Sequence, residues 1–374
     1  MNAQRTRWRR LEAPPTLNVS LLARIDGCTH PESADLLPDG EHIVFGNCAM
    51  TLGVPGYRNG AALVYLEDEA FVTLARLEAG GITDVRRQQI TGLTATLGLD
   101  VLPRATALFP AGAVFQAAGG NPVVRRGEAT PASEPDRRRA QAIVYDPLAG
   151  KVLGCVPLWA GSQLARKFNE FDQPNGLAIN AAGDLFVGDI PNGNPEAVLP
   201  PPQPSAVYHI PHAALDGLAS DAPGSADGVR RVLTPGFVNG VTISPVDDSC
   251  WVVSCSSHDE AQGALYRLTD ADFDAGELPE PAVSGLGVLD GVSITRRGTV
   301  FVSNPRTGEL HALLPDGGHV LVLVEDRPVA RTPADINVCY PRHLGGEPAL
   351  LVPDVSVAAD AGQGSVSILD ITGL

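Results

Sequence analysis

The chain has 374 residues, 44% of them hydrophobic, and carries a formal net charge of −16 at pH 7. So acidic a chain disfavours nucleic acid and anionic membranes, and we expect neither as a partner. Its 40 glycine and 32 proline residues separate short apolar runs, which predicts an all-β fold rich in turns.

The N-terminal residues and the cysteines bear on the cellular compartment. The first ten residues are basic, but no apolar segment follows them, and no apolar run approaches the ~20 residues that span a bilayer. We therefore expect a cytoplasmic protein. The six cysteines show none of the spacings typical of zinc sites, so we expect them to be small buried hydrophobic residues.

A repeated pattern of two short strands joined by a tight turn organises the chain. In three copies a glycine follows eight residues after the start, at Gly40, Gly183 and Gly298, whereas the fourth copy has Asp247 there. The second and the sixth copy are degenerate. The six copies start at Glu32, Leu97, Asn175, Asn239, Asp290 and Ile336.

The spacing of the copies predicts the architecture. Three successive clear copies start 64 and 51 residues apart, which matches one four-stranded propeller blade with loops. We therefore predict a six-bladed β-propeller of four-stranded antiparallel blades over residues 17–374, preceded by an N-terminal extension over 1–16. An N-terminal strand at 17–22 is expected to complete the last blade and close the ring. The other predicted outer strands are 61–65, 71–74, 142–145, 151–155, 206–210, 263–268, 310–313, 320–323 and 365–369.

Long connections are expected on one face of the propeller, the face where the innermost strands begin. They cover residues 50–60, 119–140, 188–205 and 254–263. Long ordered loops on a rigid scaffold usually determine specificity. The polar stretch 125–139 is interpreted either as a lid or as a disordered insertion.

The first residues of the clear copies form a candidate metal site, because innermost strands converge on the propeller axis. Two carboxylates, Glu32 and Asp290, would meet the amide oxygens of Asn175 and Asn239. Calcium is the best candidate because it takes about 6–8 oxygen ligands in flexible geometry. The absence of His and Cys from this set disfavours zinc.

An ordinary turn explains each copy when it is taken singly, since Asn-Gly and Asp-Gly are common turn sequences. Joint placement favours the metal site. At the equivalent position the second and the sixth copy carry the apolar residues Leu97 and Ile336, so the oxygens come from blades one, three, four and five.

Parts of the chain resemble a known family. Residues 173–178 and 289–293 resemble the senescence-marker-protein/gluconolactonase family of six-bladed propellers, to which diisopropyl fluorophosphatase looks related. Residues 32–40 and 237–245 resemble the corresponding paraoxonase segments. The resemblance covers most of the chain from Cys28 onward.

This resemblance implies a catalytic divalent metal, usually calcium, and a set of residues around it. The chain departs from the family at Leu97, where paraoxonases have a catalytic histidine, and at Gln173, where the family has a substrate-contacting arginine. The implied ligands are Glu32, Asn239 and Asp290, with Asn175 as a ligand or a substrate contact.

The expected activity is metal-dependent hydrolysis of a lactone, an ester or a phosphotriester. The cation would polarise the C=O or P=O bond, and Asp290 would act as general base or nucleophile. Asp189, His258 and Asn304 follow returning strands and are candidate substrate contacts. The same site also suits an isomerase, a lyase or a cyclisation catalyst, or a binding propeller with a structural metal. The partner is a small-molecule substrate whose identity the sequence leaves open, as it does the oligomeric state.

Overall fold

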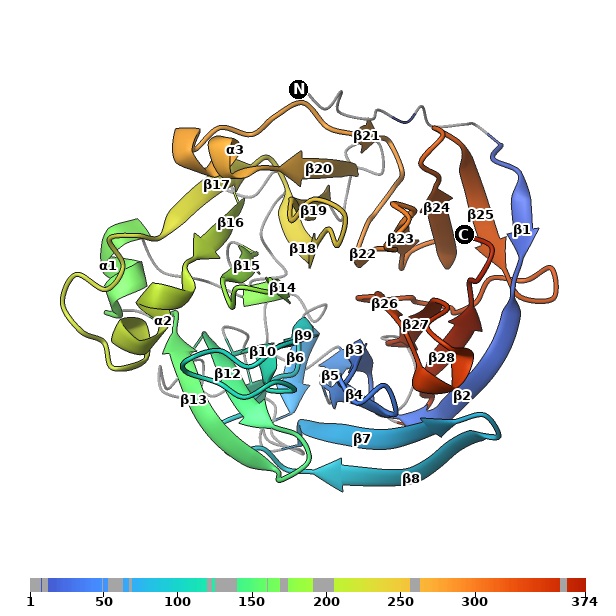
Figure 1. Cartoon of the computed structure of the whole chain (residues 1–374), viewed down its shortest axis with the longest axis horizontal. Coiled ribbons are helices and arrows are strands. Elements are labelled where there is room, and N and C mark those ends of the chain that lie inside the picture. Colours follow the sequence, from blue (N-terminus) through green and yellow to red (C-terminus); the bar gives the residue numbers. More distant parts are fainter. Residues whose placement is uncertain are drawn as a thin grey trace.

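Short apolar runs and tight turns fold into six four-stranded antiparallel sheets around a central axis (Figure 1). The predicted six-bladed β-propeller is therefore confirmed. The computed structural model describes residue 8 and residues 13–48, 50–52, 63–66, 69–119, 123–124, 140–159, 161–168, 174–190, 205–255, 263–356 and 362–374.

In each of the first three blades, the four strands lie in chain order from the axis outward. Blade one holds β3 (Pro31–Leu36), β4 (His42–Asn47), β7 (Phe71–Glu78) and β8 (Gly81–Gln88). Blade two holds β9 (Leu99–Val101), β10 (Val114–Ala118), β12 (Gln141–Asp146) and β13 (Lys151–Pro157). Blade three holds β14 (Pro174–Ile179), β15 (Leu185–Asp189), β16 (Ser205–Ile210) and β17 (Arg230–Thr234).

The remaining blades follow the same order, except that the last one takes its outermost strand from the N-terminal part of the chain. Blade four holds β18 (Phe237–Ile243), β19 (Cys250–Cys255), β20 (Ala264–Leu268) and β21 (Val283–Ser284). Blade five holds β22 (Val292–Ile294), β23 (Val300–Asn304), β24 (Glu309–Leu313) and β25 (His319–Leu323). Blade six holds β26 (Asn337–Cys339), β27 (Ala349–Asp354), β28 (Gly364–Asp370) and β2 (Ser20–Cys28).

The N-terminal segment closes the ring in two places. β2 pairs antiparallel with β28, and β1 (Thr16–Asn18) adds a parallel fifth strand to β25 of blade five (Figure 1). The predicted closure is thus confirmed, although the closing strand lies at Ser20–Cys28 and not at 17–22. Trp8 anchors the chain further, because its indole Nε1 donates to the Leu314 carbonyl at 2.7 Å and its ring lies 5.9 Å from that of Trp251.

The prediction of the outer strands of blade one was wrong in one respect. Residues 61–65 were assigned to this blade, but β6 (Leu63–Leu66) pairs with β5 (Met50–Leu52) and β11 (Val123–Val124) in a separate small sheet. The third and fourth strands are β7 and β8 instead. The side chains of β8 are mostly exposed, so it lacks the apolar run by which a strand is recognised.

Short helices lie at the outer edge of the propeller (Figure 1). The described part of the chain contains the α-helices α1 (Gln163–Phe168), α2 (His212–Ala219) and α3 (Asp270–Ala275) and a 3-10 helix at Arg342–Leu344. Within this part, none of the helices has the length and apolar character needed to cross a membrane.

The tight turns between the first two strands of the blades use left-handed backbone. Gly40, Gly183 and Gly298 have φ of 72°, 89° and 89°, a region that glycine adopts without steric cost. In the fourth copy Asp248 takes this role at φ 56°. Its N–H donates to the Ser244 carbonyl at 3.0 Å, which closes a turn one residue longer than the other three.

Glycines near the beginning of the innermost strands let neighbouring blades approach closely. A Cβ atom at Gly98, Gly176 or Gly240 would collide with a main-chain oxygen near the start of the innermost strand of the next blade. A Cβ atom at Gly291 would collide with the main chain of blade six. The oxygens met in blades three, four, five and six belong to Asn175, Asn239, Asp290 and Ala334.

This packing shows that the predicted alignment of the sixth copy with the other copies was wrong. The residue level with Asn175, Asn239 and Asp290 is Ala334, and the predicted equivalent Ile336 lies two residues further along. A parallel bridge between Ser33 and Asp335 shows the same register. The sixth copy was misaligned because it has Asp335 in place of the expected glycine.

Replacing Gly240 by alanine is expected to lower the free energy of unfolding by about 1–3 kcal/mol, because the added methyl group meets backbone that cannot move aside. Chemical denaturation monitored by circular dichroism measures this loss. Gly80→Ala is the matched control: its Cβ would have open space, so the change should stay within about 0.5 kcal/mol. Equal losses in both variants would refute the close-approach explanation.

Candidate metal centre

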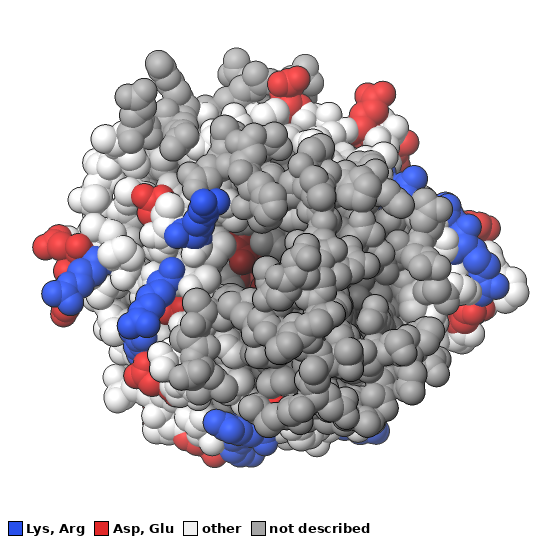
Figure 2. Space-filling view, turned by 180° about the vertical axis from the view of Figure 1, so that it is seen from behind, with Lys and Arg blue, Asp and Glu red and all other residues white. Residues whose placement is uncertain are grey.

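The four predicted ring residues lie at one level around the axis, where the innermost strands begin. Glu32 is in β3, Asn175 in β14 and Asn239 in β18, and Asp290 lies two residues before β22. Glu32, Asn175 and Asp290 are 8%, 6% and 8% exposed, and Asn239 is half-buried. Figure 2 views the molecule from behind, where acidic surface is visible near the middle, beside residues that the structure does not describe.

The two asparagines link three blades in a chain of hydrogen bonds. Asn175 Nδ2 donates to Asn239 Oδ1 at 2.9 Å, and Asn239 Nδ2 donates to the Leu289 carbonyl at 3.3 Å. These bonds orient both amides and leave the lone pairs of Asn175 Oδ1 for another partner. One N–H of each amide is thus used by the fold, while the amide oxygen of Asn175 is available at the axis.

Asp290 has an unsatisfied oxygen. Its main chain is fixed, since its N–H donates to the Ser303 carbonyl at 3.1 Å and the N–H of Gly291 donates to Ser303 Oγ at 2.7 Å. Its Oδ1 is buried and accepts no hydrogen bond. A buried carboxylate oxygen without a partner is costly, so this atom indicates a proton or a cation as its missing partner.

The carboxylates of the ring repel one another in a buried setting. Burial raises the pKa of Glu32, and the charges of Asp290 and Asp335 raise it further. Burial also raises the pKa of Asp290, to about 7. A bound divalent cation would oppose both shifts, because its positive charge favours the ionised carboxylates that burial disfavours.

The oxygen donors of the ring fit a hard divalent cation. Within the described ranges, no three His, Cys, Asp or Glu side chains come together closely enough to hold a metal ion. The candidate site instead combines two carboxylates with two amide oxygens, a donor set that suits a hard cation such as calcium. The unpartnered Asp290 Oδ1 supplies the independent structural sign of a missing ligand.

Two thiols lie near the ring but do not behave as nucleophiles. Burial raises the pKa of Cys48, and the charge of Glu32 adds to the effect. Burial likewise raises the pKa of Cys255 to about 12, with Asp290 as a further cause. Both thiols therefore stay protonated near neutral pH, and a thiolate mechanism is disfavoured.

The structure describes two of the three predicted substrate contacts, Asp189 and Asn304. Asp189 ends β15 and pairs with Pro174, the residue before Asn175, so it lies close to the level of the ring, and its role in binding stays a prediction. Asn304 is 2% exposed, and its Nδ2 donates to the Leu286 carbonyl at 3.1 Å while its Oδ1 accepts the N–H groups of Arg306 and Thr307. A substrate role for Asn304 stays a prediction. His258, Gln173 and the insert at 125–139 lie outside the described residues.

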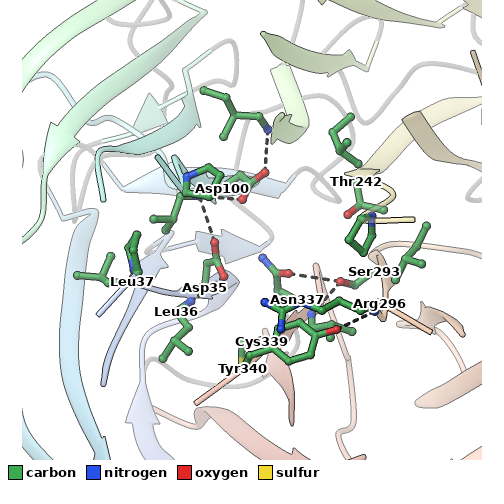
Figure 3. A pocket seen from close by; sticks show the side chains of 18 of the residues that line it. Asp35, Leu36, Leu37, Asp100, Thr242, Ser293, Arg296, Asn337, Cys339 and Tyr340 are labelled. Atoms are coloured by element: carbon green, nitrogen blue, oxygen red, sulfur yellow. Dashed lines mark hydrogen bonds between the residues drawn. The ribbon is translucent and has the colours of Figure 1, made fainter. Parts of the chain in front are cut away.

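A second polar site lies at the other end of the propeller axis, where the innermost strands end. It is a pocket of about 450 Å³, with Asp35 beside Asp100 on one side and Ser293, Asn337 and Tyr340 on the other (Figure 3). Asp35 Oδ2 accepts the N–H of Val101 at 3.1 Å, and Asp100 Oδ2 accepts that of Ile179 at 2.7 Å. These two carboxylates thus join blades one, two and three, in contrast to Asp290.

Sequence reasoning missed one acidic residue beside the ring. Asp335 is 7% exposed, and its Oδ2 accepts the hydroxyl of Ser33 at 2.8 Å. Aligning Ala334-Asp335 with Asn175-Gly176 and its equivalents would have identified it, but the absence of the glycine concealed the register.

Comparison with known proteins agrees with the fold. Protein-family models and curated protein sequences yield no match. A luciferin-regenerating enzyme superposes with a TM-score of 0.55 at 12% identity, covering 93% of this chain and 94% of its own. Regucalcin of Agrobacterium tumefaciens strain C58, a calcium-binding protein, gives 0.53 at 13%, covering 96% and 97%. A putative gluconolactonase gives 0.49 at 14%, covering 96% and 93%.

The similarity to regucalcin fits the resemblance seen in the sequence. At such low identity the similarity shows the shared fold alone. The chemistry of the ring has to be argued from its own residues.

Without a cation, the protein is expected to lose stability as the pH rises to about 7. The folded pKa of Asp290 lies above its ordinary value, so the folded state holds a proton that the unfolded state has released, and this contribution disappears as the pH passes the folded pKa. Melting temperatures in chelator from about pH 5 to about pH 8 should show the loss, and excess calcium should reduce it.

Asp290→Asn is the control, because it has no carboxyl group to titrate. Its melting temperature in chelator should fall less over the same pH range than that of the wild type. Parallel curves for the two proteins would contradict the assignment.

Proposed function

We propose that the protein is a divalent-cation-dependent hydrolase acting on a small lactone, ester or phosphotriester. The observation that carries the proposal is the buried ring of oxygens in which Asp290 Oδ1 has no hydrogen-bond partner. Glu32 and Asp290 would balance the charge of a divalent cation, and Asn175 and Asn239 would add neutral oxygen ligands. Calcium is the cation that this donor set favours.

A cation in the ring would serve hydrolysis. The carboxylates of Glu32 and Asp290 would repel a developing oxyanion unless a cation balanced them, and one N–H of each asparagine amide already donates to a protein oxygen. When bound, a divalent cation would polarise the C=O or P=O bond and stabilise that negative charge.

Asp290 is the residue proposed to move the proton. Burial raises the pKa of Asp290 in the protein without cation, and a bound cation would lower it again, so that the carboxylate is ionised and able to accept a proton. One oxygen of the carboxylate, the unpartnered Oδ1, would bind the cation, and the other would take a proton from an attacking water molecule. The hydrogen bonds from the main-chain N–H groups of residues 290 and 291 to Ser303 keep the group in place. Attack by the proton-accepting oxygen as a nucleophile is the alternative role.

Two structural neighbours support this proposal by analogy. Regucalcin is a calcium-binding protein and the luciferin-regenerating enzyme is an enzyme, and both have the fold of this chain. The cation and the catalytic role are carried over as expectations, because one fold can serve several chemistries.

Asp290→Asn should lower the hydrolysis rate by at least about 100-fold, since removing a general base typically costs 10²–10⁴-fold. The rate is measured with calcium against a panel of lactones, aryl esters and phosphotriesters. The substitution keeps the shape of the side chain, so circular dichroism should show an unchanged fold. Undiminished turnover by this variant would sink the assignment of Asp290.

The wild-type protein on the same panel decides between the remaining functions. Chelator should abolish turnover, and added calcium should restore it. Conversion of a sugar or lactone without change in mass would favour an isomerase, whereas tight calcium binding without turnover would favour a binding propeller.

A further inference from the structure

Asp335 occupies a position where the other blades avoid a charged side chain. Copies two to five of the repeat carry glycine there, namely Gly98, Gly176, Gly240 and Gly291. The first copy has Ser33, which forms a parallel bridge with Asp335 across the junction of blades one and six. A carboxylate therefore lies one residue beyond the level of the ring, at the junction that closes the propeller.

Asp335 holds the main chain next to Glu32 from two sides. Its N–H donates to the Glu32 carbonyl at 3.0 Å. Its Oδ2 accepts the Ser33 hydroxyl at 2.8 Å, and Ser33 Oγ in turn accepts the N–H of Leu99 at 3.2 Å in blade two. Through these bonds Asp335 fixes the segment that presents the Glu32 carboxylate to the axis.

Asp335 also acts on the ring through its charge. Burial raises the pKa of Asp335, the hydrogen bond from Ser33 opposes this effect, and the charges of Asp290 and Asp100 add to it. The same mutual repulsion appears at Glu32. The carboxylates of Glu32 and Asp290 thus lie in the field of a third buried carboxylate. Within the described part of the chain, these three do not form a cluster that could hold a metal ion by itself.

We propose that Asp335 is a positioning residue of the ring: it fixes Glu32 and supplies a third buried negative charge that strengthens cation binding. This inference rests on the proposed cation site. Groups that surround metal ligands in this way typically change the affinity for the metal by 10–100-fold. Without a cation, ionising all three buried carboxyl groups together costs free energy, because like charges repel one another.

The test is calorimetric titration of calcium into the wild type and Asp335→Asn at about pH 8. Asparagine keeps an oxygen for the Ser33 hydroxyl but loses the charge. The dissociation constant should rise by about 10- to 100-fold. In chelator, the melting temperature of the variant should equal or exceed that of the wild type, because repulsion is relieved.

Controls separate this effect from net charge and from folding. Asp26→Asn removes one charge from exposed β2 and should leave the dissociation constant unchanged. Asp335→Gly introduces the residue that other blades carry, and it too should weaken calcium binding. It serves as the second variant if Asp335→Asn fails to fold.

The outcomes distinguish this inference from the proposed function. A dissociation constant within about twofold of the wild type would overturn the role of Asp335 alone. If the melting temperature of Asp335→Asn in chelator is several degrees below that of the wild type, Asp335 has a structural role and the charge argument is overturned. If the wild type itself binds no calcium, the cation site fails and the role of Asp335 fails with it.

Discussion

The innermost strand of each blade has a neighbour on one side only, and its other edge faces the propeller axis. Its N–H groups there need acceptors, because unpaired buried backbone groups are costly. Side chains from the preceding blade provide them: Ser33 accepts from Leu99, Asp35 from Val101, Asp100 from Ile179 and Ser293 from Val338. The axis is therefore lined with oxygen atoms, and the closed ring depends on these bonds between blades.

This constraint explains why acidic side chains occur at both ends of the propeller axis. It also separates them into two kinds, according to their hydrogen-bond partners. The oxygens of Asp35 and Asp100 accept main-chain N–H groups and hold neighbouring blades together. Asp290 Oδ1 has no such partner, although it is equally buried. The pKa of Asp100 is raised by burial to about 6 and that of Asp290 to about 7, so the shifts alone do not tell the two apart. The hydrogen-bond partners do: the carboxylates of Asp35 and Asp100 accept main-chain N–H groups, whereas Asp290 Oδ1 accepts none.

Much of the fold could be predicted because hairpins leave local signals. Gly40, Gly183 and Gly298 mark tight turns by their need for left-handed backbone, and Asp248 substitutes for them in the fourth copy. Outer strands were harder. β8 and β17 were missed, since a strand at the outer edge of a blade can expose much of its surface and then lacks a continuous apolar run. The small sheet that contains β6 depends on a partner more than fifty residues away, β11, which no local pattern reveals.

The sequence by itself determined the repeat, the number of blades and the four residues of the candidate ring. In each copy the first side chain and the turn lie within a short stretch of sequence, where a local pattern reveals them. Only the tertiary structure decided the register of blade six and the closeness of Asp335 to Glu32, two residues about three hundred positions apart. It also decided which buried carboxylates are already satisfied. Both depend on packing between blades, where a glycine or a hydrogen-bond partner comes from a distant part of the chain. Local patterns carry no information about such contacts.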